Sequence, residues 1–401
     1  MRIRREAVRT IAIGVLAVGM LVTRGGTNLM TPVGAQSIAS KPVDSKKGGE
    51  ENFGPYEPVR GWPQRYHDAG WTWGRSPSVE ADSPNRIIRL QSGELPVLTP
   101  KVEDDHVPDE VSDCCVQGDG VPIRQAAHPE LGGRGFEPHR ARLRGAIVVF
   151  DKNGKLTEKW EQWDKLIGSN HRLLIDRYDP THPVWVTGGP KLHKFSGDGK
   201  KLLLTIGQDK PGKDKTHLGG VQDMALAPNG DIYVADSPGN ARIVKFSKDG
   251  QYLMEWGSPG KGPGQFNNTH SVAIDAKQRI NVADRENSRI QVFDANGKFL
   301  DEWPNIWDPD YVGADEGGSI WVIDGHTSKV LQYNQEGILQ SHWGTFGGKS
   351  GFLYGGHHLA TDVEGNLYIS EVYGGRTQKF RPRPGADPAK LIKGVLRGAF
   401  R

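Results

Sequence analysis

The chain has 401 residues, of which 25% are charged and 36% hydrophobic, and its formal net charge is +3. These proportions are ordinary for a soluble globular protein, and so small a net charge does not favour a nucleic-acid or membrane-surface partner. The 53 Gly and 26 Pro instead predict a chain with many turns.

The first 35 residues have the pattern of a secretory signal peptide. A basic leader, MRIRREAVRT, precedes an apolar run from Ile11 to Val22, and VGA at 33–35 offers a small-residue cleavage site. The apolar run has 12 residues, too few to cross a bilayer as a helix. Arg4-Arg5 belongs either to a twin-arginine signal or to an ordinary basic leader. We therefore expect a periplasmic or secreted protein with no membrane anchor after cleavage, and residues 36–52 as a polar flexible linker.

Hairpins of one kind recur along residues 53–401. Each has a strand, a turn usually containing Gly and a second strand, as in IVKFSKDGQYLMEWG and IQVFDANGKFLDEW. Another pair of strands precedes each hairpin, as HSVAID and RINVAD precede the second example. Aromatic residues mark equivalent positions 40 to 51 residues apart: Phe150, Phe195, Phe246, Phe293, Tyr333 and Phe380. Units of four strands with this period predict an all-β fold, a six-bladed β-propeller, and residues 56–71 are a candidate for an outer strand that closes the ring.

The first predicted blade carries a long insertion, residues 99–142, between its second and third strands. Connections of this length inside a domain are usually functional or disordered. The insertion contains three histidines and the only two cysteines of the chain: His106, His128, His139, Cys114 and Cys115. In an oxidising compartment the adjacent cysteines either form a labile vicinal disulfide that staples the loop or bind a soft metal. We expect the insertion to cover the mouth of the channel as a lid.

Histidines recur at one position of alternate blades. The first strand of a blade lines the central channel, and an acidic residue five places after the channel mouth sets the register in most blades. The mouth residues are then Pro77, His171, Gln222, His270, Asp310 and His357. In a six-fold ring, the histidines of blades two, four and six are about 120° apart and converge on the axis. One such histidine alone is more typical of a structural residue, but the set predicts a metal site with an open fourth position. Zinc is the default ion, and copper, iron and nickel are alternatives.

The stretch THSVAID followed by VADRENSRIQ, within residues 269–291, resembles the corresponding blade of the peptidyl-α-hydroxyglycine α-amidating lyases. The resemblance extends over residues 56–397 and implies NHL-type repeats and a zinc ion held by His171, His270 and His357. It also implies that Arg285 is an active-site residue near the substrate. Arg285 follows the second strand of its blade on the mouth face, where a guanidinium can clamp a carboxylate. The alternative is an arginine paired with Asp284 or Glu286.

The sequence departs from the family pattern at three places. Pro238, in DSPGN, stands where the lyases have a tyrosine thought to transfer protons, and Ser92, in LQSG, stands where they have an arginine. His358 stands where they have a carboxylate ligand of a structural calcium ion, so calcium is not expected here.

Other residues on the mouth face are candidates for the missing groups. Tyr373 and His326 occupy, in blades six and five, the loop position of the family's tyrosine, and each is either a general acid or base or an ordinary loop residue. Asp310 either orients a water molecule at the metal or is a solvated channel carboxylate.

Two function classes follow from these observations. The first is an exported metal-dependent enzyme resembling the amidating lyases, acting on a peptide, hydroxy acid, amide or lactone at the channel mouth. Its metal would polarise a substrate oxygen or lower the pKa of water, and Arg285 would hold an anion. The family's own substrates are α-hydroxyglycine peptides, released as amide plus glyoxylate. The second class is a non-catalytic NHL-repeat binding scaffold of the cell envelope, because propellers host many unrelated functions.

Overall fold

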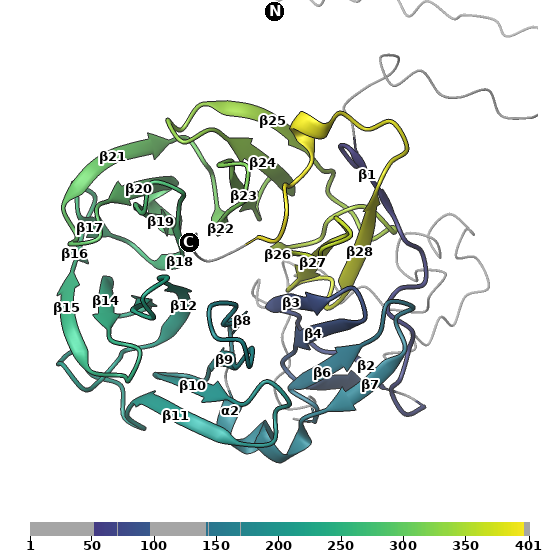
Figure 1. Ribbon diagram of the computed structural model, residues 1–401, viewed down its shortest axis with the longest axis horizontal. Coiled ribbons are helices and arrows are strands. Elements are labelled where there is room, and N and C mark those ends of the chain that lie inside the picture. The colour runs from purple at the N-terminus through teal and green to yellow at the C-terminus, as the bar shows by residue number, and fades with distance from the viewer. Residues whose placement is uncertain (1–51, 70, 97–141, 143, 169, 397–401) are drawn as a thin grey trace, which may run out of the picture. The chain divides into compact units, whose positions relative to one another are not determined.

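Four-stranded antiparallel sheets are arranged around one axis in the part of the chain that the computed structural model describes, residues 52–69, 71–96, 142, 144–168 and 170–396 (Figure 1). There are six such sheets among these residues, and each contributes its first strand to the central channel. The predicted all-β, six-bladed propeller is therefore confirmed.

Blades two to five are each built from four consecutive strands. Blade two contains β8 (Leu173–Ile175), β9 (Val184–Thr187), β10 (Lys191–Phe195) and β11 (Leu202–Gly207). Blade three contains β12 (Val221–Leu226), β13 (Ile232–Asp236), β14 (Arg242–Phe246) and β15 (Tyr252–Trp256). Blade four contains β18 (Thr269–Ile274), β19 (Ile280–Asp284), β20 (Arg289–Phe293) and β21 (Phe299–Pro304). Blade five contains β22 (Pro309–Ala314), β23 (Ile320–Asp324), β24 (Lys329–Tyr333) and β25 (Leu339–Trp343).

The ring is closed by a strand from the beginning of the propeller. Blade one contains β3 (Ser78–Ser83), β4 (Arg86–Leu90), β6 (Ile147–Phe150) and β7 (Leu156–Lys159). Blade six contains β26 (Gly356–Thr361), β27 (Leu367–Glu371), β28 (Thr377–Pro382) and, as its outer strand, β1 (Tyr56–Pro58). The antiparallel pairing of β1 with β28 sets Tyr56 opposite Pro382. Only the first three residues of the candidate closing segment 56–71 are in this strand.

A buried pair of a carboxylate and an arginine recurs at the corner between the second and third strands. The pairs are Asp236–Arg242 at 2.8 Å, Asp284–Arg289 at 2.8 Å and Glu371–Arg376 at 2.9 Å. Each of these arginines also donates to backbone carbonyls of the loop that arrives from the preceding blade, as Arg289 does to Gln265 O at 2.9 Å. The repeated acid-then-arginine pattern therefore fixes the interblade loops on the mouth face.

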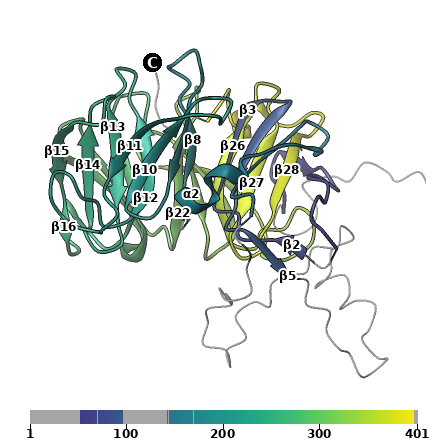
Figure 2. The same ribbon diagram turned by 90° about the horizontal axis from the view of Figure 1, so that it is seen from below.

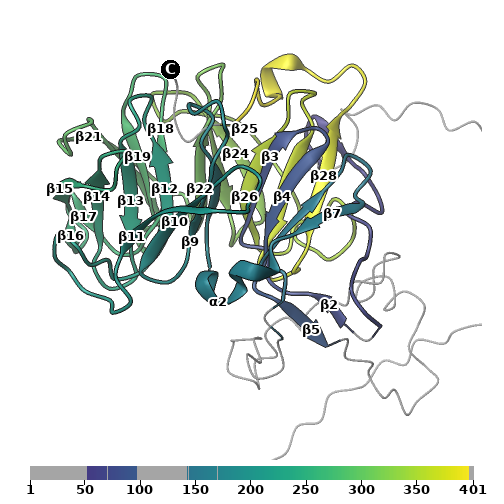
Figure 3. The same ribbon diagram turned by 60° about the horizontal axis from the view of Figure 1, so that its bottom comes forward.

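The two faces of the ring are built differently. On the mouth face lie α2 (Asp164–Ile167) and a small sheet of β2 (Trp71–Trp73) with β5 (Glu94–Pro96), all at the lower edge of the propeller in Figure 3, and the small sheet also low in Figure 2. At the opposite end of the channel, Lys393 N and Leu396 N donate to Asp315 Oδ2 and Thr361 Oγ1 at 3.1 and 2.9 Å. Within the described ranges, no helix has the length and apolar character needed to span a bilayer.

The expected signal peptide and all but Asn52 of the expected linker lie outside the described residues. So does all of the insertion except Arg142, together with its candidate residues His106, Cys114, Cys115, His128 and His139. In blade one, β4 pairs with β6, and the residues assigned to the insertion fall between these two strands in the chain.

The stability of the propeller should depend on pH through His193. This residue lies on β10 with 0% of its surface exposed, and burial lowers its pKa to about 4, against about 6.5 in an unfolded chain. Between these pH values the unfolded chain binds a proton that the folded chain does not, so stability falls as the pH decreases through this window. Urea unfolding at pH 7 and pH 5 should show a larger loss in the wild type than in His193→Gln. Equal losses in the two proteins would contradict this assignment.

Candidate metal centre at the channel mouth

The three histidines predicted to line the channel mouth converge on the axis. His270 lies on β18, His357 lies on β26, and His171 lies two residues before β8. Each offers one ring nitrogen, and the three nitrogens lie within 4.8 Å of one another. Tetrahedral zinc with Zn–N bonds of about 2.0–2.1 Å needs nitrogens about 3.4 Å apart, so a small inward movement of the rings is enough to share one ion.

Backbone carbonyls of the intervening blades set the tautomer of all three rings. The contacts are His171 Nδ1 to Gln222 O at 2.7 Å, His270 Nδ1 to Asp310 O at 2.8 Å, and His357 Nδ1 to Pro77 O at 2.7 Å. A carbonyl oxygen can only accept, so each Nδ1 carries the hydrogen and each Nε2 keeps a free lone pair. The acceptors are the mouth residues of blades three, five and one. Every ligand-bearing blade is therefore braced by the blade that follows it.

Burial keeps the three imidazoles neutral. It lowers the pKa of His171 to about 3 and the pKa of His270 and His357 well below the usual value. The guanidiniums of Arg75 and Arg285 lower the pKa of His171 further. A neutral imidazole is the form that binds a metal ion, so this donor set fits a divalent transition metal.

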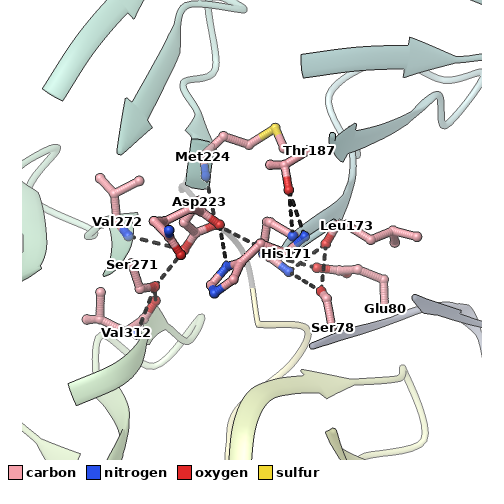
Figure 4. Close-up of polar contacts among 12 residues, drawn as sticks. Ser78, Glu80, His171, Leu173, Thr187, Asp223, Met224, Ser271, Val272 and Val312 are labelled. Carbon is pink, nitrogen blue, oxygen red and sulfur yellow. Dashed lines mark hydrogen bonds and ion pairs between the residues drawn. The ribbon is translucent and has the colours of Figure 1, made fainter. Parts of the chain in front are cut away.

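An ionic network lies one residue further along the inner strands. Figure 4 shows Glu80, Asp223 and Ser271 grouped around His171, and Arg172 joins them. Arg172 Nε lies 2.7 Å from Asp223 Oδ1, and Arg172 Nη2 lies 3.3 Å from Glu80 Oε1. Asp223 Oδ2 also accepts from Ser271 Oγ at 2.5 Å. Burial raises the pKa of Glu80 and of Asp223, and the positive charge of Arg172 opposes that rise. This network, the Arg172 layer, links blades one to four directly beneath the histidines.

Asp310 lies beside the histidine cluster. Its Oδ1 is 3.7 Å from His270 Nε2 and 3.0 Å from Arg285 Nη1. Burial raises the pKa of Asp310 to about 7, against the opposing charge of Arg285. With 7% of its surface exposed, Asp310 is not a solvated carboxylate.

Arg285 is engaged by three carboxylates. Besides Asp310, its guanidinium contacts Glu286 at 2.8 Å and Asp308 at 3.4 Å. The expected pairing with Glu286 is therefore present, whereas Asp284 pairs with Arg289. These contacts place Arg285 at the site, where it holds Asp310. A role in binding the substrate directly stays a prediction.

Arg75 is a site residue that the sequence analysis missed. Its carbonyl accepts from Ser92 N at 2.9 Å, so it lies opposite the position at which the lyases have an arginine. In the described part of the chain, its guanidinium has no hydrogen-bond or ion-pair partner. Burial lowers the pKa of Arg75, and the neighbouring side chains of Tyr373 and Asp310 raise it. Arg75 precedes the mouth residue Pro77 by two positions. This spacing was the one feature of the sequence that could have identified Arg75 as a site residue.

Tyr373 and His326 lie at the margin of the site. Tyr373 is 58% exposed and its ring centroid lies 5.8 Å from that of Tyr354. His326 stacks on Trp307, with ring centroids 5.0 Å apart and an angle of 16° between the planes. The structure thus groups the three histidines with Asp310 and Arg285, and leaves the two general acid or base candidates in the surrounding loops.

The fold and the site define a class: six-bladed β-propellers of NHL-type repeats with a three-histidine centre. A family model described as a 6-bladed beta-propeller matches residues 213–333. The chain is 28% identical to NHL repeat-containing protein 3 of Mus musculus over 266 residues, 61% of this chain and 74% of that protein. It is 29% identical to peptidyl-alpha-hydroxyglycine alpha-amidating lyase 1 of Drosophila melanogaster over 289 residues, 64% of this chain and 52% of the lyase.

The chain is thus similar to NHL repeat-containing proteins and to amidating lyases, and its match covers about half the length of the fly lyase. Among solved structures, a streptogramin B lyase aligns with a TM-score of 0.48 and 14% identity, covering 80% of this chain and 96% of that one. So distant a likeness does not inform function.

The Arg172 layer should be needed for stability. Arg172→Met leaves Glu80 and Asp223 buried without their cation, and breaking a buried ion pair in this way costs about 3–5 kcal/mol. Arg381→Met is the matched control, because Arg381 is 65% exposed in its pair with Glu57 and surface pairs contribute about 0–1 kcal/mol. Chemical denaturation compares the two variants. Similar small losses in both would contradict the structural role of the layer.

Proposed function

We propose that this protein is an exported metal-dependent propeller enzyme that acts on a small hydroxy acid, amide or lactone at the channel mouth. The observation that carries the proposal is the set of three neutral imidazoles whose free Nε2 atoms face one point. Zinc is the expected ion, and when bound it supplies Lewis-acid polarisation of a substrate oxygen. The similarity to amidating lyases supports an enzyme over a passive scaffold.

Arg75 is the group best suited to hold a substrate carboxylate. Its guanidinium is half-buried, lies close enough to His171 and His357 to lower their pKa, and has no partner among the described residues. A guanidinium binds a carboxylate with two parallel hydrogen bonds. Arg285, for which this role was expected, is already engaged by its three carboxylates. We therefore assign substrate binding to Arg75 and the positioning of Asp310 to Arg285.

Asp310 is the proposed general base. Its carboxylate lies at the histidine cluster, and the contact with Arg285 favours its ionised form. Gly325 makes room for it, because a Cβ at that position would lie 2.0 Å from Asp310 Oδ2. For an α-hydroxyglycine substrate, Asp310 takes the hydroxyl proton as the carbon–nitrogen bond breaks, and then returns that proton to the leaving amide nitrogen. Amide and glyoxylate are formed, and no other acid is needed to balance the step.

Metal content distinguishes the enzyme from the scaffold. The wild-type protein should contain about one transition-metal ion per chain by elemental analysis, and His270→Ala should lose it because two imidazoles bind the ion far more weakly. His217→Ala is the matched control, because His217 pairs with Asp214 away from the channel. A folded wild-type protein that contains no metal and takes up none would contradict the enzyme and favour the scaffold.

Turnover tests the assignments of Arg75 and Asp310. With an α-hydroxyglycine peptide, glyoxylate should be released by the wild type. Arg75→Met should raise KM at least about tenfold through the lost charged hydrogen bonds, with a smaller effect on kcat. Asp310→Asn should lower kcat by about 10²–10⁴ with little change in KM. An unchanged KM in Arg75→Met would exclude it as the carboxylate anchor. If metal is bound and glyoxylate is not released, the substrate is another member of the proposed class.

A further inference from the structure

We infer that the substrate carries a large flat apolar group beside its anionic group, and that exposed aromatic side chains of blades five and six receive it. The inference rests on the proposed function for the position of the reacting atoms. The side chains concerned are the exposed Trp307, His326, Phe346 and Tyr373 together with the buried Tyr354, hereafter the aromatic rim.

The exposure of these aromatic residues is unusual for this chain. Trp307 is 63% exposed, Phe346 is 64% exposed and Tyr373 is 58% exposed. In the part of the chain that the structure describes, these are the aromatic members of the set of exposed large hydrophobic residues. All three lie in loops of the mouth face, between β21 and β22, between β25 and β26, and after β27. Exposed apolar surface gathered in this way is typical of a binding site.

One part of the aromatic rim lies on the two loops that adjoin Asp310. Asp308, the residue after Trp307, pairs with Arg285, and Trp307 N donates to Asp324 Oδ2 at 3.1 Å. Gly325 follows Asp324 and touches the Asp310 carboxylate, so the loop that carries His326 borders the reacting atoms. The parallel stack of His326 on Trp307 holds the indole in place.

The other part of the rim lies beside Arg75. Tyr373 packs on Gly355, where a Cβ would lie 2.3 Å from the tyrosine ring, and Gly355 is two residues before His357. Tyr354 joins Tyr373 to Phe346, with ring centroids 5.8 and 5.3 Å apart. Ser76, the neighbour of Arg75, donates its backbone N–H to Glu371 O at 3.2 Å, two residues before Tyr373. An anion bound to Arg75 therefore has the aromatic residues of blade six on one side. The stack of Trp307 and His326 lies on the other side, beyond Asp310.

The combination of the Arg75 guanidinium with the aromatic rim favours a small aromatic anion over a protein partner. The guanidinium of Arg75, which has no partner among the described residues, matches one carboxylate, and flat rings offer offset stacking to another flat ring. The chemical class that fits is an α-hydroxy acid, or an α-hydroxyglycine derivative, with an aromatic or similarly large apolar substituent.

Calorimetric titration with lactate and 3-phenyllactate tests the inference. The wild type should bind 3-phenyllactate at least about tenfold more tightly than lactate, because only the former places a ring on the rim. Trp307→Ala should reduce this ratio below about threefold without changing the lactate affinity, and Trp307→Phe should restore it. Arg75→Met should weaken both ligands by a similar factor. Ile338→Ala is the matched control, since Ile338 is 59% exposed on a hairpin turn away from the mouth.

Equal wild-type affinities for the two acids would overturn the inference, as would an unchanged ratio in Trp307→Ala. The ratio requires no turnover, so it separates this inference from the proposed function. A protein that selects 3-phenyllactate through Trp307 but contains no metal would support the aromatic rim and contradict the enzyme. A metal-loaded, active protein that binds lactate and 3-phenyllactate equally would support the enzyme and contradict the aromatic rim.

Discussion

The hydrogen bond from each ligand histidine to the next blade is the constraint on which the site depends. All three bonds cross a blade boundary, from blade two to three, from four to five and from six to one. The last of them joins His357 to Pro77, which are 280 residues apart in the chain. That contact exists only when the ring is closed, and closure is made by β1 against β28. The geometry of the histidine cluster is therefore a property of the whole ring, and no single blade can preform it.

Charges above and below the three imidazoles add to the effect of burial in keeping the rings neutral. Arg75 and Arg285 on the mouth side and Arg172 beneath all lower the pKa of His171, in addition to the larger effect of burial. The same guanidiniums repel a divalent ion, and the carboxylates that accompany them reduce this repulsion: Asp310 accompanies Arg285, and Glu80 with Asp223 accompanies Arg172. The arginines of these ion pairs thus disfavour protonation of the imidazoles, and the carboxylates would reduce the repulsion of a bound cation.

The fold and the histidine cluster could be predicted from the sequence because equivalent positions of successive repeats lie at equivalent places around the propeller axis. Once the acidic marker five residues after the mouth is recognised, His270 and His357 follow from counting. The partners of Arg285 could not be obtained in this way, because Asp308 and Asp310 come from the neighbouring blade and meet it only through packing. Arg75 was missed for a related reason. It precedes its strand in the blade whose register was least secure, and only the backbone hydrogen bond from Ser92 shows which segment it lies beside.

The relation between Arg75 and Ser92 bears on how departures from a family motif should be interpreted. All mouth-face loops of a propeller converge on one axis, so a functional group can be supplied from different positions around the ring. A serine at the position of the lyase arginine removes one guanidinium, and Arg75 brings another from the segment hydrogen-bonded to it. The argument does not extend to Pro238, since Tyr373 and His326 remain exposed in the loops around the site. When a motif residue is absent in this fold, a loop of another segment can bring an equivalent group to the site from a different direction. Whether the chemistry is lost therefore has to be judged from the groups that surround the histidine cluster.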